Sequence, residues 1–174
     1  MWNAVTTVSK AMTAINMTAI KSVLLLAALC GGMSAQADPA PDQSAALHFL
    51  DDFYAALKQH DASALSGMIA GTAPVVVLFD DGDGEQTFTL SKAEYLQQVR
   101  AVWHFASDES YSVKDISYHA AASAGAPAVV SLVDSESRTI LDNPSGQRNR
   151  MEISLAATQG RIMIVAIKTH TVIW

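Results

Sequence analysis

After residue 44, the first hydrophobic pattern along the chain has the spacing of a helix. Apolar side chains recur at three- and four-residue steps, at Leu47, Leu50, Phe53, Tyr54 and Leu57. This spacing predicts an amphipathic helix of about four turns that begins at Ala45 and closes at His60 and Asp61.

Two further helices are predicted from the residues that would cap them. Asp61 is a good N-cap for a short helix over residues 62–69. Ser91 is followed three positions later by Glu94, the pattern of a capping box, so a third helix should start there and end near Ala106.

The rest of the chain has the patterns of strands. Short β-branched runs over residues 73–79 and 86–90 predict two strands, separated by an acidic, glycine-rich segment. From Ser110 onward only strands are expected, over residues 111–120, 126–141, 147–158 and 161–174. Residues 107–110 and 142–146 are predicted as turns. Helices followed by antiparallel strands are typical of the α+β class.

The last two strands predict a hairpin with a two-residue turn at Gln159 and Gly160. If pairing continues evenly from this turn, Ile153 lies opposite Ala166, and Ile167 points to the other face of the sheet. That second face would then be partly apolar. We expect a second copy of the chain to pack against this face, which predicts a homodimer through the outer face of the sheet.

The N-terminal region has the pattern of a secretory signal peptide. Basic residues come first, a short apolar run ends at Cys30, and Ala35-Gln36-Ala37 has the form that signal peptidase cleaves. The apolar run is too short for a membrane span. Cleavage after Ala37 is predicted, with lipid anchoring at Cys30 as the alternative, and Met17 as well as Met1 is a possible start.

Cleavage after Ala37 divides the chain into a signal peptide (residues 1–37), a flexible leader (38–44) and one domain (45–174). Removing Lys10 and Lys21 leaves 9 basic against 17 acidic residues, a net charge of −8. This balance argues against a nucleic-acid partner, because phosphate binding needs a basic face. The expected location is the periplasm or the medium.

The order of elements resembles the NTF2-like superfamily, which includes the SnoaL-like proteins and ketosteroid isomerase. The resemblance is carried by four segments: FYAALKQHDASALSGMIA, APVVVLF, SKAEYLQQVRAVW and QGRIMIVAIKTH. It implies a cone-shaped fold in which about three N-terminal helices pack on a strongly curved, mostly antiparallel sheet, with a pocket between them and dimers through the sheet.

The same resemblance implies where an isomerase-type site would lie. The base would be Asp80 at the end of the first strand, or Asp81 beside it, and the acid that supports the oxyanion would be Glu152. The helix tyrosine of the isomerases would fall at Phe53, which has no hydroxyl to donate. Tyr54 is adjacent, but one residue turns it by about 100° around the helix. The site therefore departs from the isomerase pattern.

Other candidate site residues follow from the chemistry of their own side chains. His170 and Lys168 share one face of the last strand, so His170 is a third acid–base candidate and Lys168 a candidate ligand-binding residue. Phe53, Tyr54 and Trp103 would line an apolar pocket. Glu152 has the alternative role of a strand ion pair.

No metal site and no cofactor is predicted. The histidines do not share one element face at ligand spacing. The acidic segment does not fit an EF-hand either, because a loop that starts at Asp81 has Gln86 where glycine belongs and Lys92 where glutamate belongs. A looser ion site in the segment stays open.

Three functions remain. The first is a non-catalytic domain that binds a small apolar molecule or a protein partner. The second is a small isomerase, cyclase or hydrolase that uses a pocket carboxylate. The third is a structural subunit of an envelope complex. The incomplete isomerase-type site favours the first.

Overall fold

The structure, a computed structural model, describes residues 38–80 and 84–173, within one compact unit that spans residues 36–174. The predicted signal peptide and Asp81 to Asp83 lie outside the described residues. The helices are α1 (Gln43–Lys58), α2 (Ala62–Met68) and α3 (Lys92–Phe105). The strands are β1 (Val75–Asp80), β2 (Glu85–Leu90), β3 (Ala106–His119), β4 (Ala128–Ile140), β5 (Asn143–Thr158) and β6 (Arg161–Ile173).

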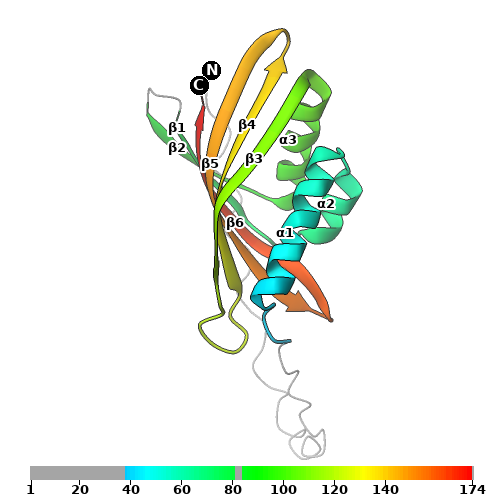
Figure 1. The fold of residues 1–174 in the computed structure, drawn as a ribbon, viewed down its shortest axis with the longest axis vertical. Coiled ribbons are helices and arrows are strands. Elements are labelled where there is room, and N and C mark those ends of the chain that lie inside the picture. Colours follow the sequence, from blue (N-terminus) through cyan, green and yellow to red (C-terminus); the bar gives the residue numbers. More distant parts are fainter. Residues whose placement is uncertain (1–37, 81–83, 174) are drawn as a thin grey trace, which may run out of the picture. The chain divides into compact units, whose positions relative to one another are not determined.

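The six strands form one sheet in the order β2-β1-β6-β5-β4-β3. Neighbours are antiparallel except β1 and β6, which run parallel. The sheet is strongly bent, and all three helices lie on the same side of it (Figure 1). We call the side that carries the helices the inner face and the opposite side the outer face. The α+β prediction, with three helices on a curved sheet, is confirmed.

The helix starts follow from the capping residues. Asp42 accepts a hydrogen bond from the Ala45 amide, so α1 begins at Gln43, two residues earlier than predicted. The end of the predicted leader is therefore ordered: Pro41 is buried and its carbonyl accepts a hydrogen bond from the Tyr118 hydroxyl at 2.7 Å. The capping box of Ser91 and Glu94 is confirmed at the start of α3.

Two segments predicted as turns belong to strands, except for Asp142. Residues 107–110 continue β3 directly from α3, and an irregularity in the pairing lets Asp108 take a positive φ of 53°. The β4–β5 turn is made by Leu141 and Asp142, with φ of 47° and 66°, and Asn143 already pairs with Ile140. Ladder pairing with a neighbouring strand thus overrides the polar local composition.

The last hairpin has the predicted turn but not the predicted register throughout. Thr158 pairs with Arg161 around Gln159 and Gly160, as expected. An irregularity at Ser154 and Leu155 then shifts the pairing by one residue, so Ile153 pairs with Ile167 rather than with Ala166. Ile167 is consequently fully buried on the inner face.

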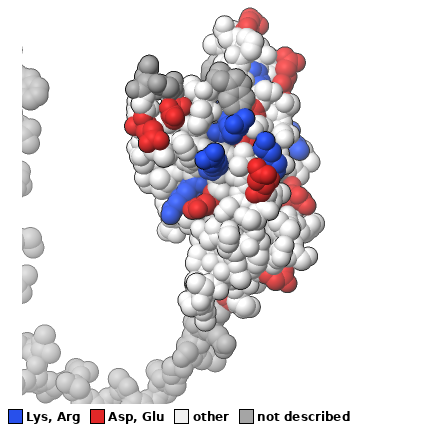
Figure 2. All heavy atoms as spheres, turned by 60° about the vertical axis from the view of Figure 1, so that its left-hand side comes forward, with Lys and Arg blue, Asp and Glu red and all other residues white. Residues whose placement is uncertain are grey.

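The outer face is therefore more polar than predicted. Lys168 is exposed and pairs with exposed Glu152, and His170 pairs with exposed Arg150. Figure 2 shows Lys and Arg side chains gathered on a face that also carries Asp and Glu. The apolar surface that motivated the homodimer is reduced, and the dimer stays a prediction. In the described part of the chain, no helix has the length and apolar character needed to span a membrane.

Candidate functional site

A cavity of about 270 Å³ lies between the inner face of the sheet and helices α1 and α3. One wall is apolar and is made by Phe53, Leu57, Val75, Val77, Phe79, Val99, Val102, Trp103, Met151 and Ile167. Ligand pockets in proteins typically start at about this volume and are lined mostly by apolar side chains with a few polar groups. The cavity has the size and lining of a small-molecule site.

The polar part of the lining, which we call the polar wall, carries a hydrogen-bonded network centred on Asp134, which is only 7% exposed. Asp134 Oδ2 accepts from the Tyr54 hydroxyl at 3.0 Å, and Oδ1 accepts from Asn149 Nδ2 at 2.6 Å. The Thr171 hydroxyl donates to Asn149 Oδ1 at 2.7 Å. Strand register explains the arrangement, because Asp134 pairs with Asn149 and Asn149 pairs with Thr171 across β4, β5 and β6.

Burial changes the acidity of this network. Desolvation raises the pKa of Asp134 above its ordinary value, although hydrogen bonds from Asn149 and Tyr54 oppose the increase. The pKa of Tyr54 is raised as well, first by burial and then by the charge of Asp134. Tyr54 therefore stays a neutral hydroxyl donor, while Asp134 can exist in both protonation states nearer to neutral pH than an exposed carboxyl.

A second carboxylate extends the polar wall. Glu136 is buried, forms an ion pair with Arg138, whose side chain is 9% exposed, and accepts a hydrogen bond from Gln147 Nε2 at 2.7 Å. Burial raises the pKa of Glu136, and the charge of Arg138 is the largest effect that opposes this. Because Arg138 offsets one negative charge, the wall presents both acceptors and a cation to the cavity.

Three of the four residues predicted to bind a ligand line this cavity. Phe53, Tyr54 and Trp103 all contribute to its wall. Both Phe53 and Tyr54 reach it, although one helical step separates them, so Tyr54 brings to the cavity a phenol hydroxyl that Phe53 lacks. Lys168 is exposed on the outer face and does not reach the cavity.

The three predicted acid–base residues do not line the cavity. Ile167, Thr169 and Thr171 face it, so His170 between them points to the outer face, as Lys168 does. Glu152 is exposed for the same reason, since Met151 and Ile153 point inward. On β1, Phe79 lines the cavity and Asp80 follows it on the opposite face. Asp80, Glu152 and His170 therefore do not border this cavity, and their acid–base roles stay predictions.

The pocket carboxylates were missed, although the sequence contains a signal for them. Buried positions alternate along β4 through Ala128, Val130 and Leu132, and the same alternation continues to Asp134 and Glu136. Two acids at the inward positions of an otherwise apolar strand indicate a polar wall inside the fold.

Comparison with solved structures gives the class of the fold. A protein described as a putative scytalone dehydratase from Novosphingobium aromaticivorans is 12% identical, with a TM-score of 0.59 over 74% of this chain and 82% of that one. An NTF2-like protein from Cytophaga hutchinsonii is 11% identical, with a TM-score of 0.59 over 75% of this chain and 98% of that one. A hexachlorocyclohexane dehydrochlorinase from Novosphingobium barchaimii is 12% identical, with a TM-score of 0.57 over 74% of this chain and 84% of that one.

These likenesses establish the fold. The described domain has the NTF2-like fold, in which a curved sheet and three helices enclose a cavity. No protein-family model matches the sequence. No curated protein matches it either. Because the NTF2-like fold has enzymes among its members, chemistry must be argued from the cavity itself.

Proposed function

We propose that this chain binds a compact small molecule in the cavity, with an apolar body against Phe53, Val77 and Trp103 and a polar group directed at Asp134. The observation that carries the proposal is the division of the cavity into an apolar wall and a wall of buried hydrogen-bonding groups. Buried polar groups arranged in this way fix the orientation of a ligand, while the apolar wall supplies contact area.

Filling the cavity should weaken binding of a matched probe. We expect 2-naphthol, which has a flat apolar body and one hydroxyl, to bind, and Val77→Phe to weaken it by at least about tenfold, or about 1.4 kcal/mol. Val77 lines the cavity, whereas neighbouring Val76 points to the outer face. Fluorescence titration of wild type, Val77→Phe and the control Val76→Phe tests this.

The two variants place the same added volume on opposite faces of β1. If Val77→Phe and Val76→Phe change the affinity for the probe equally, the probe does not enter the cavity. Naphthalene, which lacks the hydroxyl, should bind more weakly than 2-naphthol if the polar wall contributes.

Proton transfer is a second candidate function. It is favoured by the raised pKa of Asp134 beside the neutral Tyr54 donor, because a carboxyl that changes protonation nearer to neutral pH is suited to acid–base work. Two proteins of the same fold are described as a dehydratase and a dehydrochlorinase, and both names denote eliminations that remove a proton. If the measured pKa of Asp134 were that of an exposed carboxyl, this support for proton transfer would be lost.

Export with cleavage after Ala37 is proposed alongside the binding function. A cut at this position would keep Asp38, whose carboxylate accepts a hydrogen bond from the Gly160 amide at 3.0 Å. We therefore expect the N-terminus of the exported protein to be Asp38. N-terminal sequencing of the periplasmic or secreted protein tests this, and a lipid-modified N-terminus at Cys30 or an intact N-terminal segment would contradict it.

A further inference from the structure

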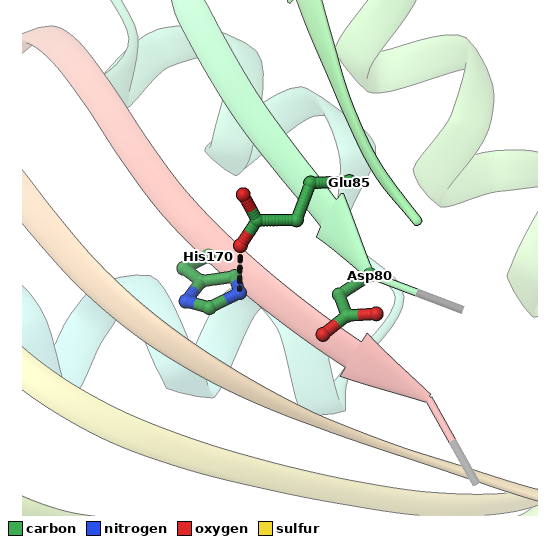
Figure 3. Close-up of side chains that lie close together, drawn as sticks. All are labelled: Asp80, Glu85 and His170. Carbon is green, nitrogen blue, oxygen red and sulfur yellow. Dashed lines mark ion pairs between the residues drawn. The ribbon is translucent and has the colours of Figure 1, made fainter. Parts of the chain in front are cut away.

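Three potential metal ligands meet on the outer face, on the other side of the sheet from the cavity. Asp80, Glu85 and His170 each offer one ligand atom, and these atoms all lie within 4.8 Å of one another. Figure 3 shows the three side chains converging from the end of β1, the start of β2 and the strand β6. The cluster is separate from the proposed ligand pocket and does not depend on it.

Backbone pairing holds the cluster in place. Asp80 pairs directly with Glu85 across the β1–β2 ladder, so their side chains share a face. His170 pairs with Leu78 across the parallel β1–β6 ladder, and Leu78 is two positions before Asp80, on that same face. A site built on three paired strands is better preorganised than one built on a loop.

The imidazole of His170 supplies an independent observation. Its Nε2 atom is shielded from solvent and has no hydrogen-bond partner in the described part of the chain. Glu85 Oε1 is 3.9 Å away from it, beyond hydrogen-bond length. Shielded ring nitrogens normally have a partner. Here the nitrogen faces a space that two carboxylates border.

A metal ion fits this spacing after a small movement of the side chains. Zinc–nitrogen and zinc–oxygen bonds are about 2.0–2.2 Å, so neighbouring ligand atoms of one tetrahedral zinc ion stand about 3.4 Å apart. The 3.9 Å between His170 Nε2 and Glu85 Oε1 is only slightly longer than this separation. The Glu85 side chain is 60% exposed, so it has the freedom to move the remaining tenths of an ångström.

We propose that Asp80, Glu85 and His170 form a binding site for a first-row divalent transition metal ion such as Zn²⁺. Imidazole together with carboxylates favours such ions over Ca²⁺ and Mg²⁺, which take oxygen ligands alone. Three protein ligands leave at least one coordination position for water or an exogenous ligand. Bound metal would tie the end of the β1–β2 hairpin to β6.

The test is Zn²⁺ binding by calorimetry to the untagged full chain after treatment with a chelator. We expect a site that His170→Gln and Glu85→Gln each weaken by at least about 10- to 100-fold, the loss that even supporting residues of metal sites cause. His48→Gln is the matched control, because His48 also lies 3.9 Å from a carboxylate, that of Asp52, but without a third ligand. It should bind Zn²⁺ like the wild type.

Three results would overturn the proposed site. The first is an absence of Zn²⁺ binding by the wild type, and the second is equal Zn²⁺ binding by the wild type and His170→Gln. The third is Ca²⁺ binding that is as tight as Zn²⁺ binding and is retained in His170→Gln. Melting curves without metal should be similar for all four proteins, since the three substituted side chains are at least 33% exposed. Zn²⁺ should raise the melting temperature of the wild type and of His48→Gln alone.

Discussion

Phe53→Ala is expected to lower the free energy of unfolding by about 3–5 kcal/mol, the usual cost of truncating a buried phenylalanine. Phe53 is 1% exposed in α1, and its ring packs edge-on against Tyr54 with centroids 5.6 Å apart. The truncation removes transfer free energy and also enlarges a cavity that is already open at this position. Urea denaturation followed by circular dichroism measures the loss.

Phe88→Ala is the control for this change. Phe88 is 46% exposed on β2, so the same truncation should alter the free energy of unfolding by no more than about 0.5 kcal/mol. Equal losses in the two variants would mean that Phe53 does not pack in the core. A fall in the denaturant slope for Phe53→Ala would instead indicate a change in the unfolded state.

The helices could be predicted because their signals are local. Asp61 and Ser91 cap the helices that follow them, and each capping interaction joins residues no more than three positions apart. The turn at Gln159 and Gly160 was predictable for the same reason, since two residues with positive φ suffice to form it. Beyond a few residues from such a signal, pairing with distant strands decides the structure.

The candidate site was harder to predict because it depends on which face each strand residue takes. One irregularity at Ser154 and Leu155 reverses the expected face of Ile167 and of the residues after it. Positions carried over from a family by counting along the chain, such as Glu152, fail when the face is not known. Tyr54 shows the opposite case, since the helix is placed so that it and Phe53 both reach the cavity.

The metal cluster has no local signature at all. Asp80 and His170 are far apart in sequence, and they meet only because β6 returns parallel to β1. EF-hand spacing in the acidic segment tests only ligands that one loop supplies. Glu85 instead combines with residues of two other strands, and such a combination becomes visible only once the strand order is known.

The unfolding free energy should fall as pH rises from about 4 toward neutral, and Asp134→Asn should reduce this dependence. Burial raises the pKa of Asp134 in the folded state, so between its ordinary pKa and its raised pKa the folded chain binds more protons than the unfolded chain. Stability then decreases with increasing pH, because ionising the buried carboxyl opposes folding. Each unit by which the pKa is raised corresponds to about 1.4 kcal/mol.

The measurement is urea denaturation of both proteins at a series of pH values from about 4 to 8. Glu136 has a raised pKa as well and contributes in the same direction, so the dependence should shrink in Asp134→Asn without disappearing. Asp51→Asn, at an exposed position of α1, should follow the wild type. A pH dependence that Asp134→Asn leaves unchanged would show that Asp134 ionises as an exposed carboxyl does. The cavity would then keep its binding role, and the case for proton transfer would be lost.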